Sequence, residues 1–168
     1  MTLTSAETAL LTIISNRLGV KYEDLYQLIK FESGWNPVAK NSRSSARGLL
    51  QWTDSSARQL GFSDSADMIK KNPAIADQLE LVLRYLEPKK PFPTKQSLFM
   101  AVFYPAARSW DQDRVFPDTV RSANPGIDTV RDYMRLATGN KRSKNDLIIP
   151  IALIGFLIIK LFRKVKNG

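Results

Sequence analysis

Glu32 is the residue whose place in the sequence best suits acid–base chemistry. A helix is predicted from 22 to 33, and Glu32 follows Leu25 by seven residues, on the same face as the apolar stripe. The stripe consists of Leu25, Leu28 and Ile29. This spacing directs the carboxyl group toward the core near the helix C-terminus, where burial and the helix dipole both raise its pKa. An acid held protonated in this way can act as a general acid. The alternative is a Glu32 that turns to solvent or pairs with Arg43 or Arg47.

The composition excludes most other catalytic groups. The 168 residues contain no His and no Cys, so a Ser-His-Asp triad, a Cys-His pair and a zinc site built on thiolate or imidazole are all excluded. The chemistry of an enzyme with this sequence therefore falls to carboxylates, Tyr or Lys. We expect neither a metal nor a cofactor.

The elements that must position Glu32 are predicted to be helices. Capping and stop signals predict six of them, at about 5–18, 22–33, 54–60, 73–86, 94–103 and 128–137. The first begins with the capping box Thr4-Ser5-Ala6-Glu7 and stops at Gly19, and the fourth is predicted to begin with Asn72 as N-cap and Pro73 as first residue. No segment alternates polar and apolar residues as a strand does. The predicted fold class is all-α, or nearly so.

The charge is concentrated in the last 29 residues, where it flanks an apolar run. The net charge is +9, but residues 1–139 hold 18 basic and 15 acidic side chains, whereas 140–168 hold seven basic ones and one acid. Residues 147–159 carry no charge, and with 160–162 the apolar run reaches 16 residues. The snorkelling stems of Lys160 and Arg163 can lengthen such a span, which predicts a C-terminal transmembrane helix. The alternative is a buried C-terminal helix of the globular domain.

The predicted organisation is therefore a helical domain at 1–138, a basic polar linker at 139–146, a transmembrane helix at 147–162 and a basic tail at 163–168. The slight excess of positive charge after the span favours a cytoplasmic C-terminus, with the domain on the other side of the membrane. Residues 1–7 lack the basic start of a signal peptide. Nucleic-acid binding is not expected, because the domain carries only a mild positive excess without a basic cluster.

Two motifs that follow Glu32 resemble a known family. Glu32-Ser33-Gly34-Trp35-Asn36-Pro37 with Ala39, followed by Ala46-Arg47-Gly48-Leu49-Leu50-Gln51, resembles the catalytic domain of the soluble lytic transglycosylases. That family has a lysozyme-like fold related to goose-type lysozyme. A third family motif, Ala-Tyr-Asn-Ala-Gly, is matched in degraded form by Phe103-Tyr104-Pro105-Ala106-Ala107. The segment from Asn124 to Val130 resembles phage-encoded members.

The resemblance implies a role for four residues. Glu32 falls on the catalytic acid of the family, and Ser33 and Gln51 fall on substrate-binding residues that line the sugar groove. Tyr104 falls on a tyrosine whose hydroxyl contacts that acid, and it is also expected to bind substrate. Pro105 replaces the Asn of the third motif, so the groove contacts made there are expected to differ from those of the family.

The implied reaction is cleavage of the β-1,4 bond between N-acetylmuramic acid and N-acetylglucosamine in peptidoglycan, with formation of a 1,6-anhydro ring. The alternatives are a lysozyme-type hydrolase of the same bond, which would need a second carboxylate such as Asp54 or Asp111, and a non-catalytic wall-binding protein of the same fold. The expected partners are glycan strands, a lipid bilayer through 147–162 and virion membrane proteins. The expected setting is the periplasm, with a single-pass anchor, or the internal membrane of a phage virion.

Overall fold

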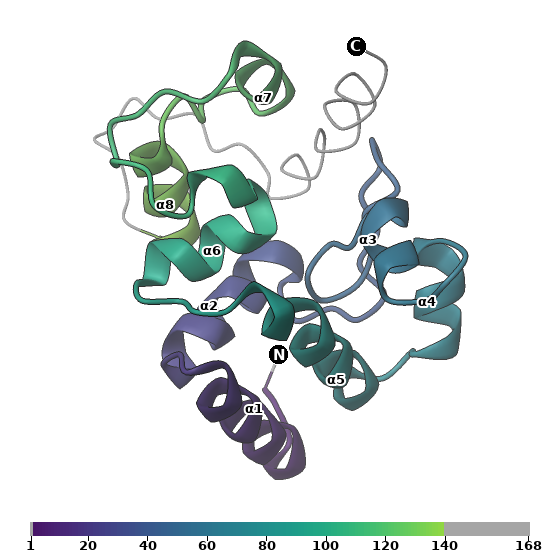
Figure 1. Cartoon of the computed structure of the whole chain (residues 1–168). Helices are drawn as coiled ribbons and strands as arrows, with labels where there is room; N and C mark the ends of the chain where they lie inside the picture. The colour runs from purple at the N-terminus through teal and green to yellow at the C-terminus, as the bar shows by residue number, and fades with distance from the viewer. Residues whose placement is uncertain (1, 140–168) are drawn as a thin grey trace.

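The structure is a computed structural model that describes residues 2–139 (Figure 1). Within that range it contains helices and isolated bridges but no strands, so the predicted all-α class is confirmed. Two of the bridges join Arg47 to Lys40 and to Trp52, and they shape the loop between the second and third helices.

Most of the helices are joined by short turns, and the two longer connections are 34–53, after α2, and 108–117, before α7. They are α1 (Ser5–Leu18), α2 (Tyr22–Ser33), α3 (Asp54–Gln59), α4 (Ser65–Lys71), α5 (Ile75–Leu86), η1 (Glu87–Lys89), α6 (Lys95–Phe103), η2 (Pro105–Ala107), α7 (Asp118–Ala123) and α8 (Val130–Thr138).

The ends of the first two helices follow their sequence signals. The Thr4 side chain accepts a hydrogen bond from the Glu7 backbone, and the Glu7 carboxylate accepts one from the Thr4 backbone, which completes the capping box of α1. Gly19 and Gly34 end α1 and α2 in the left-handed conformation, which a glycine adopts without steric cost. Gly34 thus turns the chain immediately after Glu32.

The predicted start of α5 is wrong. Asn72 ends α4 and does not begin α5, whose N-cap is Ala74. The Asn72 side chain donates a hydrogen bond to the carbonyl of Met68, four residues back, so it closes the preceding helix. The short helices α4 and α7 were not predicted, because six or seven residues carry too little apolar periodicity to be recognised.

Helix α2 lies at the centre of the described chain and packs against α1, α6 and α8. Its face of Leu25, Leu28 and Ile29 is completely buried, as the stripe predicted. Helices α3 and α4 pack on each other on the opposite side of the molecule from α8 (Figure 1). A single cluster of buried side chains connects these elements, so the end of α2 is held by neighbours from both halves of the described chain.

Among residues 2–139, no helix is both long and apolar enough to cross a bilayer. The predicted transmembrane helix at 147–162 and the basic tail at 163–168 lie outside the described residues, as does the linker beyond Gly139.

Candidate active site

Glu32 lies in the last turn of α2, partly buried, and is hydrogen-bonded to a residue 101 positions further along the chain. The hydroxyl of Tyr133, on α8, donates to Glu32 Oε1 at 3.3 Å. The stripe on α2 therefore directs Glu32 inward, as the spacing predicted, and the packing of α8 against α2 supplies its partner.

Tyr133 is held in place by aromatic packing. Its side chain is completely buried. The Phe103 ring stacks on it with centroids 4.2 Å apart, and the Phe31 ring meets it edge-on at 5.5 Å. Buried aromatic pairs of this kind leave a ring little freedom to turn. The hydroxyl of Tyr133 is thus fixed where it meets Glu32.

Burial raises the pKa of Glu32 to about 8, and the hydrogen bond from Tyr133 offsets part of that rise. Within residues 2–139, no second carboxylate contributes to the shift. The pKa of Tyr133 lies well above its ordinary value, because of burial first and the Glu32 charge second, so its hydroxyl remains a donor. At neutral pH a carboxyl group with a pKa of about 8 is about 90% protonated, which is the state that a general acid requires.

The two motif segments that follow Glu32 are joined by one buried side chain, that of Gln78 on α5. Its Oε1 accepts from the backbone N–H of Leu49 at 2.9 Å, and its Nε2 donates to the carbonyls of Pro37 and Asn72, each at 2.8 Å. Gln78 is fully buried, and all of these bonds form within the protein. It therefore ties the Asn-Pro turn to the Gly-Leu segment.

Gly48 is required where the Gly-Leu segment approaches α4 and α5. Its φ is +73°, and a Cβ there would lie 2.5 Å from Ile69 Cδ1 and 2.7 Å from Gln78 Oε1. Any side chain at this position would displace Gln78 and be strained in the left-handed region. The glycine of the motif is explained by this close approach.

Ser33 and Gln51 are both partly buried, and each makes a local hydrogen bond. The Ser33 hydroxyl donates to the carbonyl of Ile29, one turn back on α2, at 3.2 Å. Gln51 Nε2 donates to the carbonyl of Gly48 at 3.0 Å, and the Gln51 backbone has a φ of +47°. A left-handed glutamine stores strain of a kind that concentrates at functional sites. The assignment of Ser33 and Gln51 to substrate binding stays a prediction.

The hydrogen bond to Glu32 that the resemblance assigned to Tyr104 is made instead by Tyr133. Tyr104 ends α6, and its ring packs edge-on against Trp110 at 5.6 Å and Phe116 at 5.7 Å. The chain continues from it into η2, which begins at Pro105. Its predicted contact with substrate remains a prediction.

Both candidates for a second catalytic carboxylate, Asp54 and Asp111, accept hydrogen bonds from other groups of the protein. Asp54 Oδ1 accepts from the Ser65 backbone at 3.1 Å and from the Ser65 hydroxyl at 2.8 Å. Partial burial raises the pKa of Asp54, but the Ser65 bonds and the charges of Arg58 and Arg47 outweigh it, so the pKa lies below its ordinary value. Asp111 Oδ1 accepts from the backbone of Asp113 in a turn at 2.8 Å.

Three residues of the site could not be recognised from the motifs. Gln78 and Tyr85 lie within the predicted helix 73–86 and Tyr133 within the predicted helix 128–137, but no sequence signal assigned any of them to the site. Burial raises the pKa of Tyr85, a hydrogen bond with Ser56 lowers it, and the Glu32 charge raises it again, which places Tyr85 in the surroundings of Glu32. A polar residue on a buried helical face was the available signal for Gln78. Within residues 2–139 there is also no group of three or more carboxylates that could hold a metal ion.

Comparison with known proteins matches one segment of the chain to a family model. Residues 10–78 match the family model described as the transglycosylase SLT domain, and this stretch includes Glu32, Gln51 and Gln78. Searches of curated proteins and of solved structures returned no match. The match covers residues 10–78, which is less than half of the chain, and makes this segment similar to the transglycosylase SLT domain.

Proposed function

We propose that this protein is a peptidoglycan lytic transglycosylase in which Glu32 is the catalytic acid. In the first step Glu32 donates its proton to the glycosidic oxygen between N-acetylmuramic acid and N-acetylglucosamine. The bond from that oxygen to the anomeric carbon breaks, and positive charge develops on the carbon. Tyr133 steadies the Glu32 carboxylate that remains, since its hydroxyl already donates to Oε1.

The second step closes the anhydro ring. The 6-hydroxyl oxygen of the muramic acid attacks the anomeric carbon, and the Glu32 carboxylate takes the hydroxyl proton. The enzyme thus returns to its starting protonation state without consuming water. The N-acetyl group of the substrate can stabilise the positive centre between the two steps, so a single protein carboxylate suffices.

The observation that carries this proposal is a lone, partly buried Glu32 with a pKa of about 8 inside a matched SLT segment. Hydrolysis by the usual inverting or retaining mechanism uses a second carboxylate close to the scissile bond. The two candidates, Asp54 and Asp111, are engaged by Ser65 and by a backbone turn. This arrangement favours ring closure over hydrolysis.

The test is digestion of purified peptidoglycan by the wild type and by Glu32→Gln, with products identified by mass spectrometry. The amide is nearly isosteric and cannot donate a proton as an acid does, so we expect at least a thousandfold loss of cleavage. The matched control is Glu23→Gln, an exposed carboxylate in the first turn of the same helix, which should retain activity.

Each product points to one reaction. Muropeptides lighter by one water than the hydrolysed form indicate anhydro-ring formation, and the hydrated form indicates lysozyme-type chemistry. Binding to the wall without cleavage by the wild type would reject the enzyme and leave a wall-binding protein of the same fold. The degraded third motif, with Pro105 and Ala107, is the feature that favours this last alternative.

We also propose that the enzyme is anchored to a membrane through 147–162. The domain then acts in the periplasm, and the membrane that holds the anchor is either that of the cell or the internal membrane of a phage virion. The support is the sequence pattern: an apolar run between two basic stretches, preceded by a polar linker. Detection of the protein in purified virus particles would support the virion setting, and its presence only in uninfected cells would reject it.

A further inference from the structure

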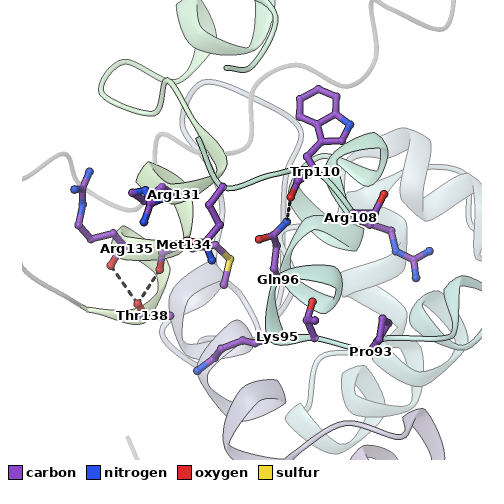
Figure 2. A pocket seen from close by; sticks show the side chains of 12 residues that line it. Pro93, Lys95, Gln96, Arg108, Trp110, Arg131, Met134, Arg135 and Thr138 are labelled. Carbon is purple, nitrogen blue, oxygen red and sulfur yellow. Dashed lines mark hydrogen bonds between the residues drawn. The ribbon is translucent and has the colours of Figure 1, made fainter. Parts of the chain in front are cut away.

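A groove separates α6 from α8 and has a volume of about 820 Å³ (Figure 2). We call it the α6–α8 groove. Met134 on α8 and Gln96 on α6 face each other across it, and Gln96 is fixed by a hydrogen bond from its Nε2 to the carbonyl of Trp110 at 2.7 Å. The charged residues that line it are all cationic, and no Asp or Glu is among the lining residues. They are Lys95, Arg108, Arg131 and Arg135.

Three of these four cations have carboxylate partners that lie outside the groove. Lys95 pairs with Asp24 at 3.0 Å, Arg131 pairs with Asp113 at 2.7 Å, and Arg135 pairs with Asp132. Arg131 donates two hydrogen bonds to the Asp113 carboxylate, at 2.7 and 2.8 Å, and both side chains are solvent-exposed, so another anion can compete with Asp113 for this guanidinium.

Arg108 differs from the other three cations. Its guanidinium donates to the carbonyl of Pro91 and lies over the Phe92 ring, 5.2 Å from the centroid. Within residues 2–139, no carboxylate pairs with it. The groove therefore offers one cation without a carboxylate partner, Arg108, and one whose carboxylate partner is exposed, Arg131.

The groove lies on a different face from the catalytic acid. Tyr133 turns inward to Glu32, whereas the next residue, Met134, lines the groove. Lys95 is paired with Asp24 in the first turn of α2, and Glu32 lies eight residues later, about 12 Å along the helix axis. A surface bound in the groove would leave the face that holds Glu32 open to glycan.

The chain leaves the domain at this groove. Thr138 lines it, Gly139 follows, and only the seven residues 140–146 precede the apolar run. Seven residues span at most about 25 Å when extended. The segment 140–168 has a strong positive excess and does not complement the cationic lining, so charge favours an anionic occupant over this segment. An anionic bilayer entered by residue 147 lies within reach.

We propose that the α6–α8 groove is a docking site for the phosphate headgroups of anionic phospholipids, which holds the domain against the bilayer with Glu32 facing away. The proposal rests on the membrane anchor proposed above. Phosphates exchange with Asp113 at Arg131 and pair with Arg108, while Met134 and the side-chain stems provide an apolar floor for the glycerol region. Docking would fix the orientation of the domain relative to the bilayer.

Trp110 provides a reporter inside the groove. The chain has three tryptophans, and Trp35 and Trp52 are 2% and 1% exposed, whereas Trp110 is partly exposed and lines the groove. Quenching of tryptophan fluorescence by acrylamide, a neutral quencher, therefore reports mainly on this site. The Trp110→Phe variant should remove the accessible signal and so verify the assignment.

The experiment uses the full chain in vesicles of phosphatidylcholine alone or with about 30% phosphatidylglycerol. The anchor tethers the domain in both, so only docking depends on lipid charge. We expect Trp110 to be shielded from acrylamide in the anionic vesicles, and we expect high salt to abolish the shielding.

The variant Arg108→Gln/Arg131→Gln should lower the docked-to-undocked ratio by roughly tenfold, because each cation near an anionic leaflet contributes up to about a fivefold gain. The matched control is Arg58→Gln/Lys70→Gln, which removes the same charge from exposed positions on α3 and α4 and should retain the shielding.

Three results would overturn the proposal: equal shielding in neutral and anionic vesicles, equal loss in both double variants, or shielding by soluble muropeptides instead of lipid. The last would assign the groove to the wall. Failure here differs from failure of the anchor, because flotation of the full chain with the neutral vesicles reports insertion without docking, and cleavage of soluble glycan by the groove variant is measured separately from both. Cleavage that persists without lipid-dependent shielding rejects docking alone.

Discussion

At the scale of single residues, the Glu32 carboxyl group is subject to two opposing effects. Burial favours its neutral form, and the hydroxyl of Tyr133 favours its charged form. A general acid in a glycosidase must donate its proton in one step and be stable as a carboxylate until the next. The hydrogen bond from Tyr133 stabilises the carboxylate form of Glu32, and it lowers the protonated fraction only in part because burial still raises the pKa.

The pH dependence of cleavage follows from this balance. Activity requires protonated Glu32, so it should fall as the pH rises through about 8. Tyr133→Phe keeps the ring and removes the donor, so the pKa of Glu32 rises and the alkaline limb moves upward, by about half a unit to one unit. The measurement is kcat/KM on peptidoglycan from about pH 6 to about pH 10.

The control for that profile is Phe103→Leu, which loosens the stacking on Tyr133 but keeps the hydroxyl. It should lower activity without the upward shift. A Tyr133→Phe profile whose alkaline limb stays in place or moves down would show that the hydroxyl does not stabilise the Glu32 carboxylate.

At the scale of elements, the site depends on how α5 holds the loop between α2 and α3. Gln78→Leu would leave the N–H of Leu49 and the carbonyls of Pro37 and Asn72 without their partner in a buried place. We expect the free energy of unfolding to fall by about 2–5 kcal/mol, as when several buried polar groups lose their partners. Urea unfolding of the full chain measures it.

The matched control is Gln59→Leu, at an exposed position in the last turn of α3, which should change stability by less than about 0.5 kcal/mol. Gln78→Leu should also reduce cleavage, because only the folded fraction is active and both motif segments are displaced within it. Equal effects of the two substitutions would mean that the loop is held by other contacts.

Local signals in the sequence predicted the helices that carry them. The capping box at Thr4, the terminal Gly19 and Gly34, and the stripe on α2 each depend on neighbours within one or two turns. Asn72 was assigned to the wrong helix because an Asn-Pro pair can either end one helix or begin the next. The hydrogen bond from the Asn72 side chain to the carbonyl of Met68 shows that it ends α4.

The position of Glu32 was predictable for the same reason, but its partner was not. The burial of Glu32 follows from spacing on one helix, whereas its contact with Tyr133 depends on the packing of α8 against α2 across 101 residues of chain. The family motif directed attention to Tyr104, which lies in the aromatic cluster with Trp110 and Phe116. Gln78 likewise acts through tertiary hydrogen bonds that no local pattern specifies.

At the scale of the whole molecule, the distribution of charge separates the catalytic part from the part proposed to meet a bilayer. Residues 1–139 carry a mild positive excess, and the segment from 140 onward carries most of the +9. A general attraction to an anionic wall would be served by charge spread over the domain. Charge placed on both sides of an apolar run instead favours position and orientation at a membrane.

Ile154→Arg tests that assignment, because it places a charge in the middle of the apolar run. Insertion of a helix with a central Arg is less favourable by about 2.5–3.5 kcal/mol, so the variant should leave the membrane fraction after alkaline extraction while the wild type stays in it. Ser143→Arg adds the same charge in the linker and should stay with the membrane. If the run were instead a buried helix of the globular domain, Ile154→Arg would lower the free energy of unfolding and leave membrane partitioning unchanged.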